Sequence, residues 1–196
     1  RSFTETLIRR KPVYKGLAIN FRVDEIRLPN GRRAYREYVD HPGAAAVVPI
    51  LGPAVVLVRQ YRHPVGETTY EIPAGKLDGS EPPIRCIRRE LEEETGYSAG
   101  RLRRLLTFWP APAFSNESLH IYVADRLSPG VMRPDEDEFI EAVRVPLRTA
   151  LSWIASGKIK DAKTIIGLLA YASGIRPTRT GSVRKRRAQK HARPRA

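Results

Sequence analysis

Four glutamates stand close together in the segment 89–94. In a helix, which turns by about 100° per residue, Glu90, Glu93 and Glu94 lie on one face within about 100° of arc. Glu90 and Glu94 are one turn apart, so their charges repel each other when nothing lies between them. Carboxylate oxygens that leave positions free for water are ligands that suit Mg²⁺ or Mn²⁺. The pattern therefore predicts a divalent-metal site on one face of a helix.

The same residues also fit a less specific interpretation. Glu-rich helix faces are common on protein surfaces, and a solvated acidic face needs no metal. Arg89 precedes Glu93 by four residues and is expected to pair with that carboxylate alone. Glu93 is then either a metal ligand or half of a structural ion pair. Glu81 either stabilises the start of the helix or lies at the edge of a metal site.

A helix that carries these glutamates is predicted for residues 82–95. Its apolar residues recur at spacings of three and four, which gives the helix one hydrophobic face. Ser80 is the expected N-terminal cap, and Gly96 suits the position that follows a helix end. The acidic face therefore lies beside an apolar stripe that needs a partner layer.

The rest of the chain indicates an α/β protein with an N-terminal β-hairpin. Residues 13–40 alternate between apolar and polar, and Asn30-Gly31 is suited to the turn between two strands. Further strands are predicted at 44–51, 53–61, 68–72, 102–109, 118–124 and 139–145, and further helices at 147–156 and 162–173. The expected organisation is an N-terminal arm (1–43), a catalytic domain (44–175) and a basic, disordered tail (176–196).

Composition narrows the classes of protein that remain. The 196 residues carry a net charge of +14, but the tail holds nine Lys and Arg and no acidic residue, which leaves +5 for residues 1–175. A nucleic-acid footprint over the whole protein is therefore weakly supported. The single cysteine, Cys86, excludes an intramolecular disulfide and a Cys-rich zinc site, and it predicts a reducing, cytoplasmic setting. No apolar run approaches the roughly 18 residues of a membrane span.

The segment 75–97 extends the glutamate pattern. It reads Gly-x5-Glu-x7-Arg-Glu-apolar-x-Glu-Glu-x-Gly-apolar and matches at every fixed position over 23 residues. In this pattern the sequence closely resembles the Nudix hydrolases. The resemblance covers residues 13–173 and implies a Nudix-type α/β/α sandwich with a mixed β-sheet. It also implies hydrolysis of a nucleoside diphosphate linked to another group.

We call residues 75–97 the box. Segments outside the box resemble the ADP-ribose pyrophosphatase branch of the family. They are 43–44, 59–62, 71–75 and 135–138. Members of that branch carry a proline 15 residues past the box, which here is Pro112, and the surrounding loop, which includes Glu117, resembles the substrate loop. Ala113 departs from the glycine that is usual there and adds a Cβ in a tight loop.

The resemblance implies metal-binding and catalytic roles. Glu90 and Glu94 are implied metal ligands, together with the backbone carbonyl of Ala74, and Mg²⁺ is the implied cofactor with Mn²⁺ as a substitute. A general base is implied in the acidic loop after the box, with Glu138 and Glu136 as the candidates. One of the two activates water while the other completes the metal shell, and clustered carboxylates raise one another's pKa.

The remaining candidates concern the substrate. Glu93 is kept as a further catalytic candidate. Arg62 is the first candidate for binding the substrate phosphates, and Arg36 is the second, because arginine binds phosphate oxygens bidentately. Pro112 and Glu117 are expected to line the substrate loop. The aromatic residues either stack on adenine or belong to the core; they are Tyr35, Trp109 and Phe114.

The predicted function is Mg²⁺-dependent hydrolysis of ADP-ribose to AMP and ribose 5-phosphate. Another nucleotide sugar, a diadenosine polyphosphate and an oxidised nucleoside triphosphate stay as alternative substrates. A non-catalytic module that binds nucleotide or RNA is the alternative from another class, but the chain keeps every carboxylate of the box. The resemblance also implies that the arm is exchanged between two subunits of a homodimer. The tail is either a solvating segment or a weak electrostatic nucleic-acid binder.

Overall fold

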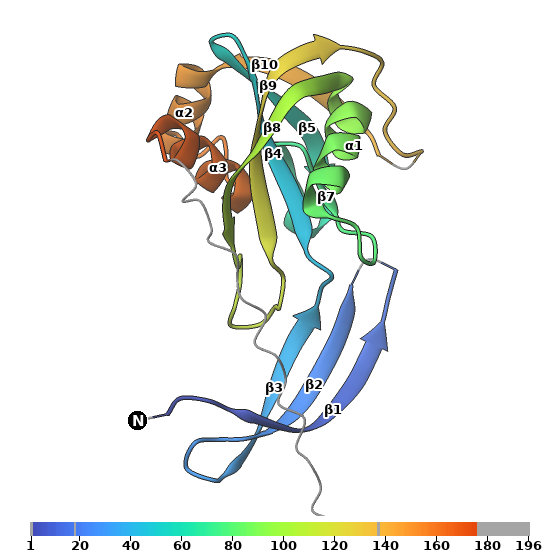
Figure 1. The fold of residues 1–196 in the computed structure, drawn as a ribbon, viewed down its shortest axis with the longest axis vertical. Helices are drawn as coiled ribbons and strands as arrows, with labels where there is room; N and C mark the ends of the chain where they lie inside the picture. Colours follow the sequence, from blue (N-terminus) through green and yellow to red (C-terminus); the bar gives the residue numbers. More distant parts are fainter. Residues whose placement is uncertain (1, 18, 137, 176–196) are drawn as a thin grey trace, which may run out of the picture.

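The computed structural model describes residues 2–17, 19–136 and 138–175. Within them, a small three-stranded sheet precedes a seven-stranded sheet that is flanked by helices (Figure 1). We call the first part the arm (residues 1–43) and the second part the body (44–175). The expected tail, 176–196, lies outside the described residues.

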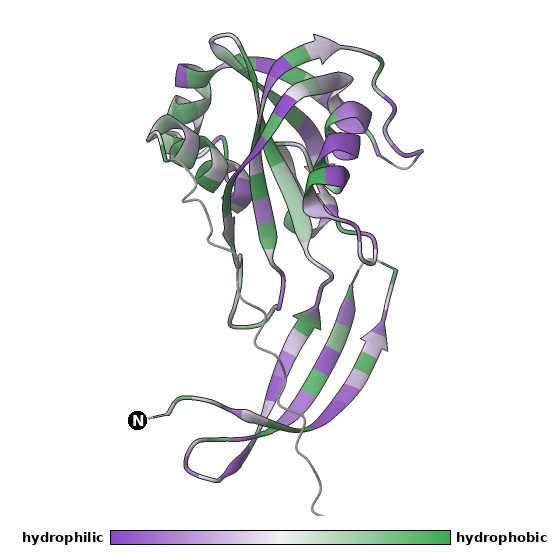
Figure 2. Cartoon of the chain, in the orientation of Figure 1, coloured by the Kyte–Doolittle hydropathy of each residue, from purple (hydrophilic) through white to green (hydrophobic). Residues whose placement is uncertain are grey.

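The arm is an antiparallel sheet in the order β1-β2-β3. Its strands are β1 (Thr6–Lys15), β2 (Asn20–Arg27) and β3 (Arg33–Asp40). The predicted hairpin is formed by β2 and β3, and Gly31 adopts a φ of 85° in its turn. The third strand, β1, was not predicted, and all of its residues are exposed. Hydrophilic and hydrophobic residues alternate along the arm (Figure 2), as in a sheet with two different faces.

The body is built on a mixed sheet in the order β10-β5-β4-β9-β8, with β6 beside β5 and β7 beside β4. The strands are β4 (Ala44–Leu51), β5 (Ala54–Arg62), β6 (Glu67–Glu71), β7 (Ala74–Lys76), β8 (Tyr97–Phe108), β9 (Leu119–Pro129) and β10 (Ile140–Pro146). The central pair β4–β9 is parallel, and the other pairs are antiparallel. The parallel pair is buried, as expected of strands that are covered on both faces.

Helices cover both faces of this sheet (Figure 1). The helix α1 (Pro83–Thr95) lies on one face, while α2 (Leu147–Ala155) and α3 (Ala162–Ala172) lie on the other. Alternate residues of β4 serve the two layers: Val47 packs in the core cluster under α1, and Val48 packs in the cluster under α2 and α3. The predicted α/β/α sandwich with a mixed sheet is confirmed.

Local differences from the predicted elements occur around α1. The expectation that Ser80 caps the helix is wrong, because the helix starts after the extended residue Pro82 and no side chain caps it. Gly96 ends the helix at a φ of 70°, as predicted. The short strand β7 was not predicted, and it lies between β4 and α1, where it bears directly on the acidic face.

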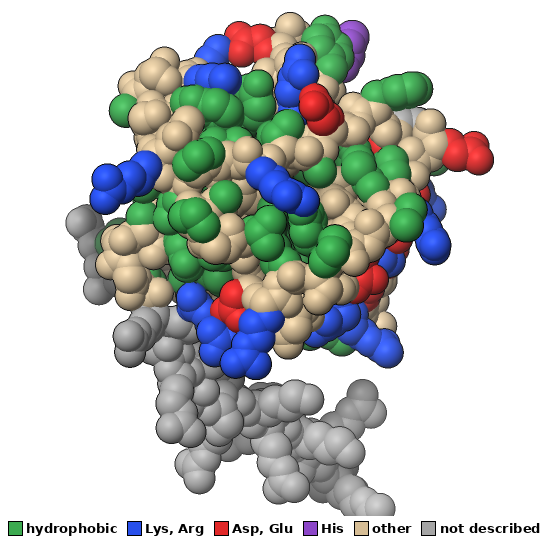
Figure 3. All heavy atoms as spheres, turned by 90° about the horizontal axis from the view of Figure 1, so that it is seen from above, with side chains coloured by type: hydrophobic (Ala, Val, Ile, Leu, Met, Phe, Trp, Pro, Cys, Tyr) green, Lys and Arg blue, Asp and Glu red, His purple; other side chains and the backbone are tan. Residues whose placement is uncertain are grey.

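The surface of the body carries both signs of charge. Figure 3 looks onto the end of the body remote from the arm, where Lys and Arg lie among hydrophobic and acidic side chains. This end is therefore not a continuous basic face. In the described part of the chain, every helix is too short or too polar to cross a membrane.

Candidate active site

The acidic face of α1 lies against the backbone of β7. Ile87 and Leu91 are fully buried on the side of the helix that faces the sheet, next to Glu94, and they fix the rotation of the helix. Glu94 is thereby turned inward and is only 4% exposed, and its Oε2 accepts a hydrogen bond from the amide of Ala74 at 3.2 Å. The first residue of β7 and the last acidic residue of the box are thus in direct contact.

Gly75 allows a second carboxylate to approach the same strand. A Cβ at Gly75 would lie 1.9 Å from Oε1 of Glu90, which no real structure tolerates. The glycine is therefore needed for a close approach of the Glu90 carboxylate to the backbone of β7. Glu90, Glu94 and Ala74, three of the predicted metal ligands, are brought together at this point.

Burial and like charges make this carboxylate pair unfavourable. Burial raises the pKa of Glu94 to about 8, the charges of Glu90 and Glu138 act in the same direction, and the Ala74 amide opposes them. Burial also raises the pKa of Glu90, against the opposing charge of Arg89. Such a pair of raised carboxyl pKa values in one place is typical of a functional site.

Arg89 neutralises one side of the acidic face. Its guanidinium lies 2.7 Å from Glu93, 2.9 Å from Glu90 and 3.8 Å from Glu81. The expectation that Arg89 pairs with Glu93 alone is therefore wrong. Burial lowers the pKa of Arg89, but the charges of Glu90 and Glu93 outweigh burial and raise it overall. Glu81 stays partly unsatisfied, since its Oε2 is buried and accepts no hydrogen bond from the described residues.

The donor set fits a hard divalent cation. It consists of carboxylate oxygens and a backbone carbonyl oxygen. The carboxyl pKa values are raised, and a nearby positive charge would lower them. Within the described ranges, no group of three His, Cys, Asp or Glu is already gathered around one point. Glu90 is instead engaged with Arg89, and Glu94 with the Ala74 amide. The carboxylates are thus near one another but are not preassembled as a cage.

The acidic loop lies between β9 and β10. Its first part is fixed to α1, because the amide of Gly130 donates to Gly96 O at 2.6 Å and the amide of Arg133 donates to Glu93 O at 2.9 Å. Glu138 acts electrostatically on both Glu90 and Glu94, so the loop returns toward the acidic face. Glu136 is exposed in the turn before it.

Arg62 is bound to a residue that the sequence analysis did not assign. Its Nε and Nη2 donate to the two carboxylate oxygens of Glu71, each at 2.8 Å. Glu71 also accepts from Thr69 at 2.6 Å and from Lys163. Burial raises the pKa of Glu71, but the pairing with Arg62 and Lys163 outweighs it and lowers the pKa to about 2. Arg62 lines an open cleft of about 460 Å³ with this cluster.

Arg36 and Pro112 line a different cleft, of about 680 Å³, between β3 and the loop that carries Pro112. Arg36 itself is bound to Glu5. The loop is attached to β3 through the Val39 amide, which donates to Phe114 O at 2.9 Å. Within one chain, therefore, Arg36 and Arg62 do not share a cleft.

Trp109, Phe114 and Glu117 belong to the segment between β8 and β9 that also carries Pro112, whereas Tyr35 lies on β3. Oε1 of Glu117 lies 4.0 Å from Nδ1 of His41, at the junction of the arm and the body. The aromatic residues are exposed rather than part of the core: Tyr35 at 62%, Trp109 at 67% and Phe114 at 61%. Of these, Trp109 lines the cleft that Arg36 and Pro112 also line.

Comparisons with known proteins agree with this geometry. The NUDIX domain family matches residues 40–166. The chain is 40% identical over 169 residues to the "ADP-ribose pyrophosphatase" of Bacillus subtilis (strain 168), covering 84% of this chain and 90% of the relative. It is 41% identical over 169 residues to the "Methanol dehydrogenase activator" of Bacillus methanolicus, covering 85% and 91%. A crystal structure described as an "ADP compounds hydrolase" superimposes with a TM-score of 0.78 at 23% identity, covering 89% of this chain and 96% of that one.

Proposed function

The chain belongs to the Nudix family and is a hydrolase, and we propose that it cleaves the pyrophosphate of ADP-ribose to give AMP and ribose 5-phosphate. The observation that carries the proposal is the pair formed by the half-buried Glu90 and the buried Glu94 against the backbone of β7. The name of the Bacillus subtilis relative, which is similar over most of both chains, supports the choice of substrate.

Mg²⁺ is the proposed cofactor, with Mn²⁺ as a substitute. Glu90, Glu94, Glu138 and the carbonyl of Ala74 would hold it, since hard oxygen donors suit this ion. When bound, the ion supplies positive charge that neutralises the pyrophosphate and stabilises the leaving oxygen. Side chains of this protein are proposed to accept the proton of the attacking water and to orient the substrate.

The acidic loop is proposed to supply the base. A loop carboxylate, Glu138 or Glu136, accepts a proton from water as the water oxygen attacks phosphorus. The bond from phosphorus to the bridging oxygen breaks, and each product leaves as a phosphate monoester. Glu93 contributes to the site through Arg89, which it holds beside Glu90.

Arginine side chains are proposed to orient the substrate. Arg62 is held bidentately by Glu71 and has its remaining N–H groups available for phosphate oxygens in the cleft. Arg36 is proposed as the second arginine that binds the substrate phosphates, and Pro112 and Glu117 are proposed to line the substrate loop. This assignment requires that the cleft at the arm and the cleft at Arg62 meet in the assembled protein.

A homodimer that exchanges the arm would bring them together. The arm exposes all of β1, and a three-stranded sheet with so much exposed apolar surface is expected to pack on a partner. Sedimentation velocity at micromolar concentration tests this, and a fully active monomer would contradict it. A cytoplasmic location is proposed from the single cysteine, Cys86, which is free and buried.

Weak electrostatic nucleic-acid binding by the tail stays a prediction that concerns residues outside the described ones. It is tested by retention of the full chain on a nucleic-acid column in increasing salt.

Product analysis by anion-exchange chromatography tests the catalytic proposal. ADP-ribose, a GDP-sugar, a diadenosine polyphosphate and ATP are offered at equal concentration, with Mg²⁺ or with EDTA. We expect AMP from ADP-ribose in the presence of Mg²⁺, and a loss of at least about 100-fold in Glu94→Gln. Preferred cleavage of another substrate would refute the substrate assignment but keep the box chemistry. No cleavage with any metal would refute the proposal as a whole.

A further inference from the structure

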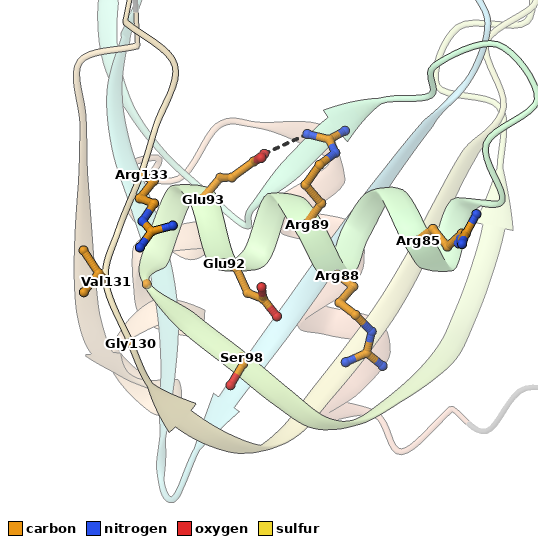
Figure 4. A pocket seen from close by; sticks show the side chains of 10 residues that line it. Arg85, Arg88, Arg89, Glu92, Glu93, Ser98, Gly130, Val131 and Arg133 are labelled. Carbon is orange, nitrogen blue, oxygen red and sulfur yellow. Dashed lines mark hydrogen bonds and ion pairs between the residues drawn. The ribbon is translucent and has the colours of Figure 1, made fainter.

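The proposed metal site has a helix side and a strand side, and different parts of the chain hold the two. The helix side is fixed next to α1 itself. Arg89 is bound to Glu93 at 2.7 Å, and the amide of Arg133 donates to Glu93 O near the end of the same helix (Figure 4). The strand side is Ala74, the first residue of β7, and these contacts do not involve it.

Ala74 follows a short crossing in which the chain leaves one strand for another. The strand β6 ends at Glu71 beside β5, and β7 begins at Ala74 beside β4. The two residues between them, Ile72 and Pro73, belong to neither strand, and Pro73 has no N–H. Ile72 is fully buried, so its amide needs a hydrogen-bond partner from outside the sheet.

Thr164, in the first turn of α3, supplies that partner. Its Oγ1 accepts a hydrogen bond from the Ile72 amide at 2.8 Å, and Thr164 is fully buried. The same hydroxyl donates to Oδ2 of Asp161 at 2.6 Å, and the Thr164 amide donates to that oxygen at 3.0 Å. Because a hydroxyl has one proton to donate, Asp161 leaves the lone pairs of Oγ1 free to accept from Ile72.

The helix α3 comes close enough for this contact because of Gly167. A Cβ at Gly167 would lie 3.1 Å from Cδ1 of Ile72 and 3.1 Å from Cγ2 of Val48, which is closer than side chains normally pack. Gly167 follows Thr164 by three residues, so both lie on the face of α3 that meets the sheet. The helix therefore fixes both the side chain and the amide of Ile72.

Two further hydrogen bonds carry this constraint to the carboxylates. Pro73 O accepts from the amide of Val47 at 2.9 Å, and the Ala74 amide donates to Glu94 at 3.2 Å. Residues 72–74 are thus bound to α3, β4 and α1 in turn. The position of the Ala74 carbonyl relative to Glu94 depends on all three contacts.

We propose that Thr164 is a positioning residue for the metal site, whose hydroxyl holds the crossing so that the Ala74 carbonyl lies beside Glu90 and Glu94. The inference rests on the proposed function, because it takes Ala74 as a metal ligand. Thr164 acts through the backbone and touches neither the ion nor the substrate. The loss of such an outer contact typically weakens metal binding by about 10–100-fold.

Binding of Mn²⁺ to the full chain without substrate tests the proposal, with the electron paramagnetic resonance signal of free Mn²⁺ as the readout. Thr164→Val keeps the shape of the side chain but removes the acceptor, and we expect it to bind Mn²⁺ at least about 10-fold more weakly. Thr164→Ser keeps the hydroxyl, so its Mn²⁺ affinity should stay close to that of the unmodified protein.

Ala170→Gly is the control for a loss of stability. Ala170 is buried near the other end of α3, and glycine there destabilises the helix without touching its first turn. Urea unfolding in EDTA measures the stability of each variant, and we expect Ala170→Gly to lower the urea midpoint while the Mn²⁺ affinity stays unchanged. Where Thr164→Val does not fold, Thr164→Cys takes its place, because a thiol is only a weak acceptor.

Three results would overturn the inference and leave the proposed function intact. The first is an unchanged Mn²⁺ affinity in Thr164→Val, or in Thr164→Cys where it takes its place. The second is an equal loss in Thr164→Ser, which would assign the effect to packing of the methyl group. The third is an equal loss in Ala170→Gly, which would assign it to the stability of α3. No Mn²⁺ binding by the unmodified protein would instead refute the metal site of the proposed function, and the inference with it.

Discussion

Replacing Glu71 by glutamine tests how the body holds Arg62, the arginine that we propose binds the substrate. The Glu71 side chain is 3% exposed and is bound by Arg62, Lys163 and Thr69. Glutamine keeps the shape of the side chain and can still accept one hydrogen bond, but it removes the charge. Among the residues that the structure describes, Lys163 then keeps Asp161, at 3.0 Å, as its remaining acidic partner. The substitution therefore separates the electrostatic part of this cluster from its packing.

The magnitude follows from the lowered pKa of Glu71. A pKa of about 2 in place of 4.5 corresponds to about 3 kcal/mol in the free energy of unfolding at pH 7, at about 1.4 kcal/mol per pKa unit. Breaking a buried ion pair by removing one partner costs about 3–5 kcal/mol, which agrees. The expected decrease in the urea midpoint is about 1 M, for a slope of about 2–3 kcal/mol per molar.

The lowered pKa of Glu71 determines how its contribution to the free energy of unfolding changes with pH. Because the folded-state pKa of Glu71 is lowered, its contribution is present above pH 4.5 and is lost as the pH falls toward about 2. The difference in the free energy of unfolding between the unmodified protein and Glu71→Gln should therefore shrink, from about 3 kcal/mol at pH 7 to less than about half of that at pH 3.

Urea unfolding at pH 7 and pH 3 measures this difference. Glu67→Gln is the matched control, because Glu67 pairs with Lys160 while both side chains are more than half exposed, and such pairs contribute about 0–1 kcal/mol. An equal loss in the two variants would refute the reasoning, and so would a difference for Glu71→Gln that is the same at both pH values. In activity assays, Glu71→Gln is expected to raise KM for ADP-ribose, since it releases Arg62, and the control is not.

Three further substitutions test the acidic face. Gly75→Ala places a Cβ 1.9 Å from Glu90 Oε1, so product formation should fall about 100-fold while the urea midpoint changes little; equal activity would show that the close approach is not needed. Glu138→Gln should lower kcat by about 100-fold or more, and an unchanged kcat would exclude it as base and ligand. Burial raises the pKa of Glu94 to about 8, so folding at pH 7 in EDTA must protonate this carboxyl, and glutamine avoids that cost; Glu94→Gln should therefore raise the thermal midpoint in EDTA and abolish the further increase on adding Mg²⁺.

The sequence predicted the body more fully than the arm. The buried strand Ala44–Leu51 is a continuous apolar run, and its bounds agree with the prediction, whereas β8 begins five residues earlier than predicted and β9 ends five residues later. The strand β1 was not predicted, because a run of charged residues and a proline interrupts any alternation of apolar and polar residues. The run consists of Arg9, Arg10, Lys11 and Pro12, and none of the residues of β1 is buried. Its pairing with β2 comes from backbone hydrogen bonds and from contacts such as Arg10 with Asp24, which periodicity does not reveal.

In the candidate site, too, the sequence predicted the local arrangement of residues but not their long-range contacts. The spacing of Glu90 and Glu94 is local, so helix periodicity alone placed them on one face. The partners of Arg62 were not predictable in this way, because Lys163 is 92 residues from Glu71 in sequence and meets it only where α3 packs against β6. Glu71 directly precedes the loop that leads into β7 and stands in the segment that resembles the branch, which was the signal available for finding it.

The acidic face of α1 shows why these long-range contacts are needed. Left to itself, a helix with this charge pattern would turn Glu94 outward into water, where the repulsion from Glu90 is screened. The buried stripe of Ile87 and Leu91 forbids that rotation, and Gly75 brings the backbone of β7 close enough to enclose the carboxylates. The energy of core packing therefore holds the two carboxyl groups where neither helix propensity nor electrostatics would place them. Such a conflict between local preference and the fold is expected at a functional site and not in a solvated surface helix.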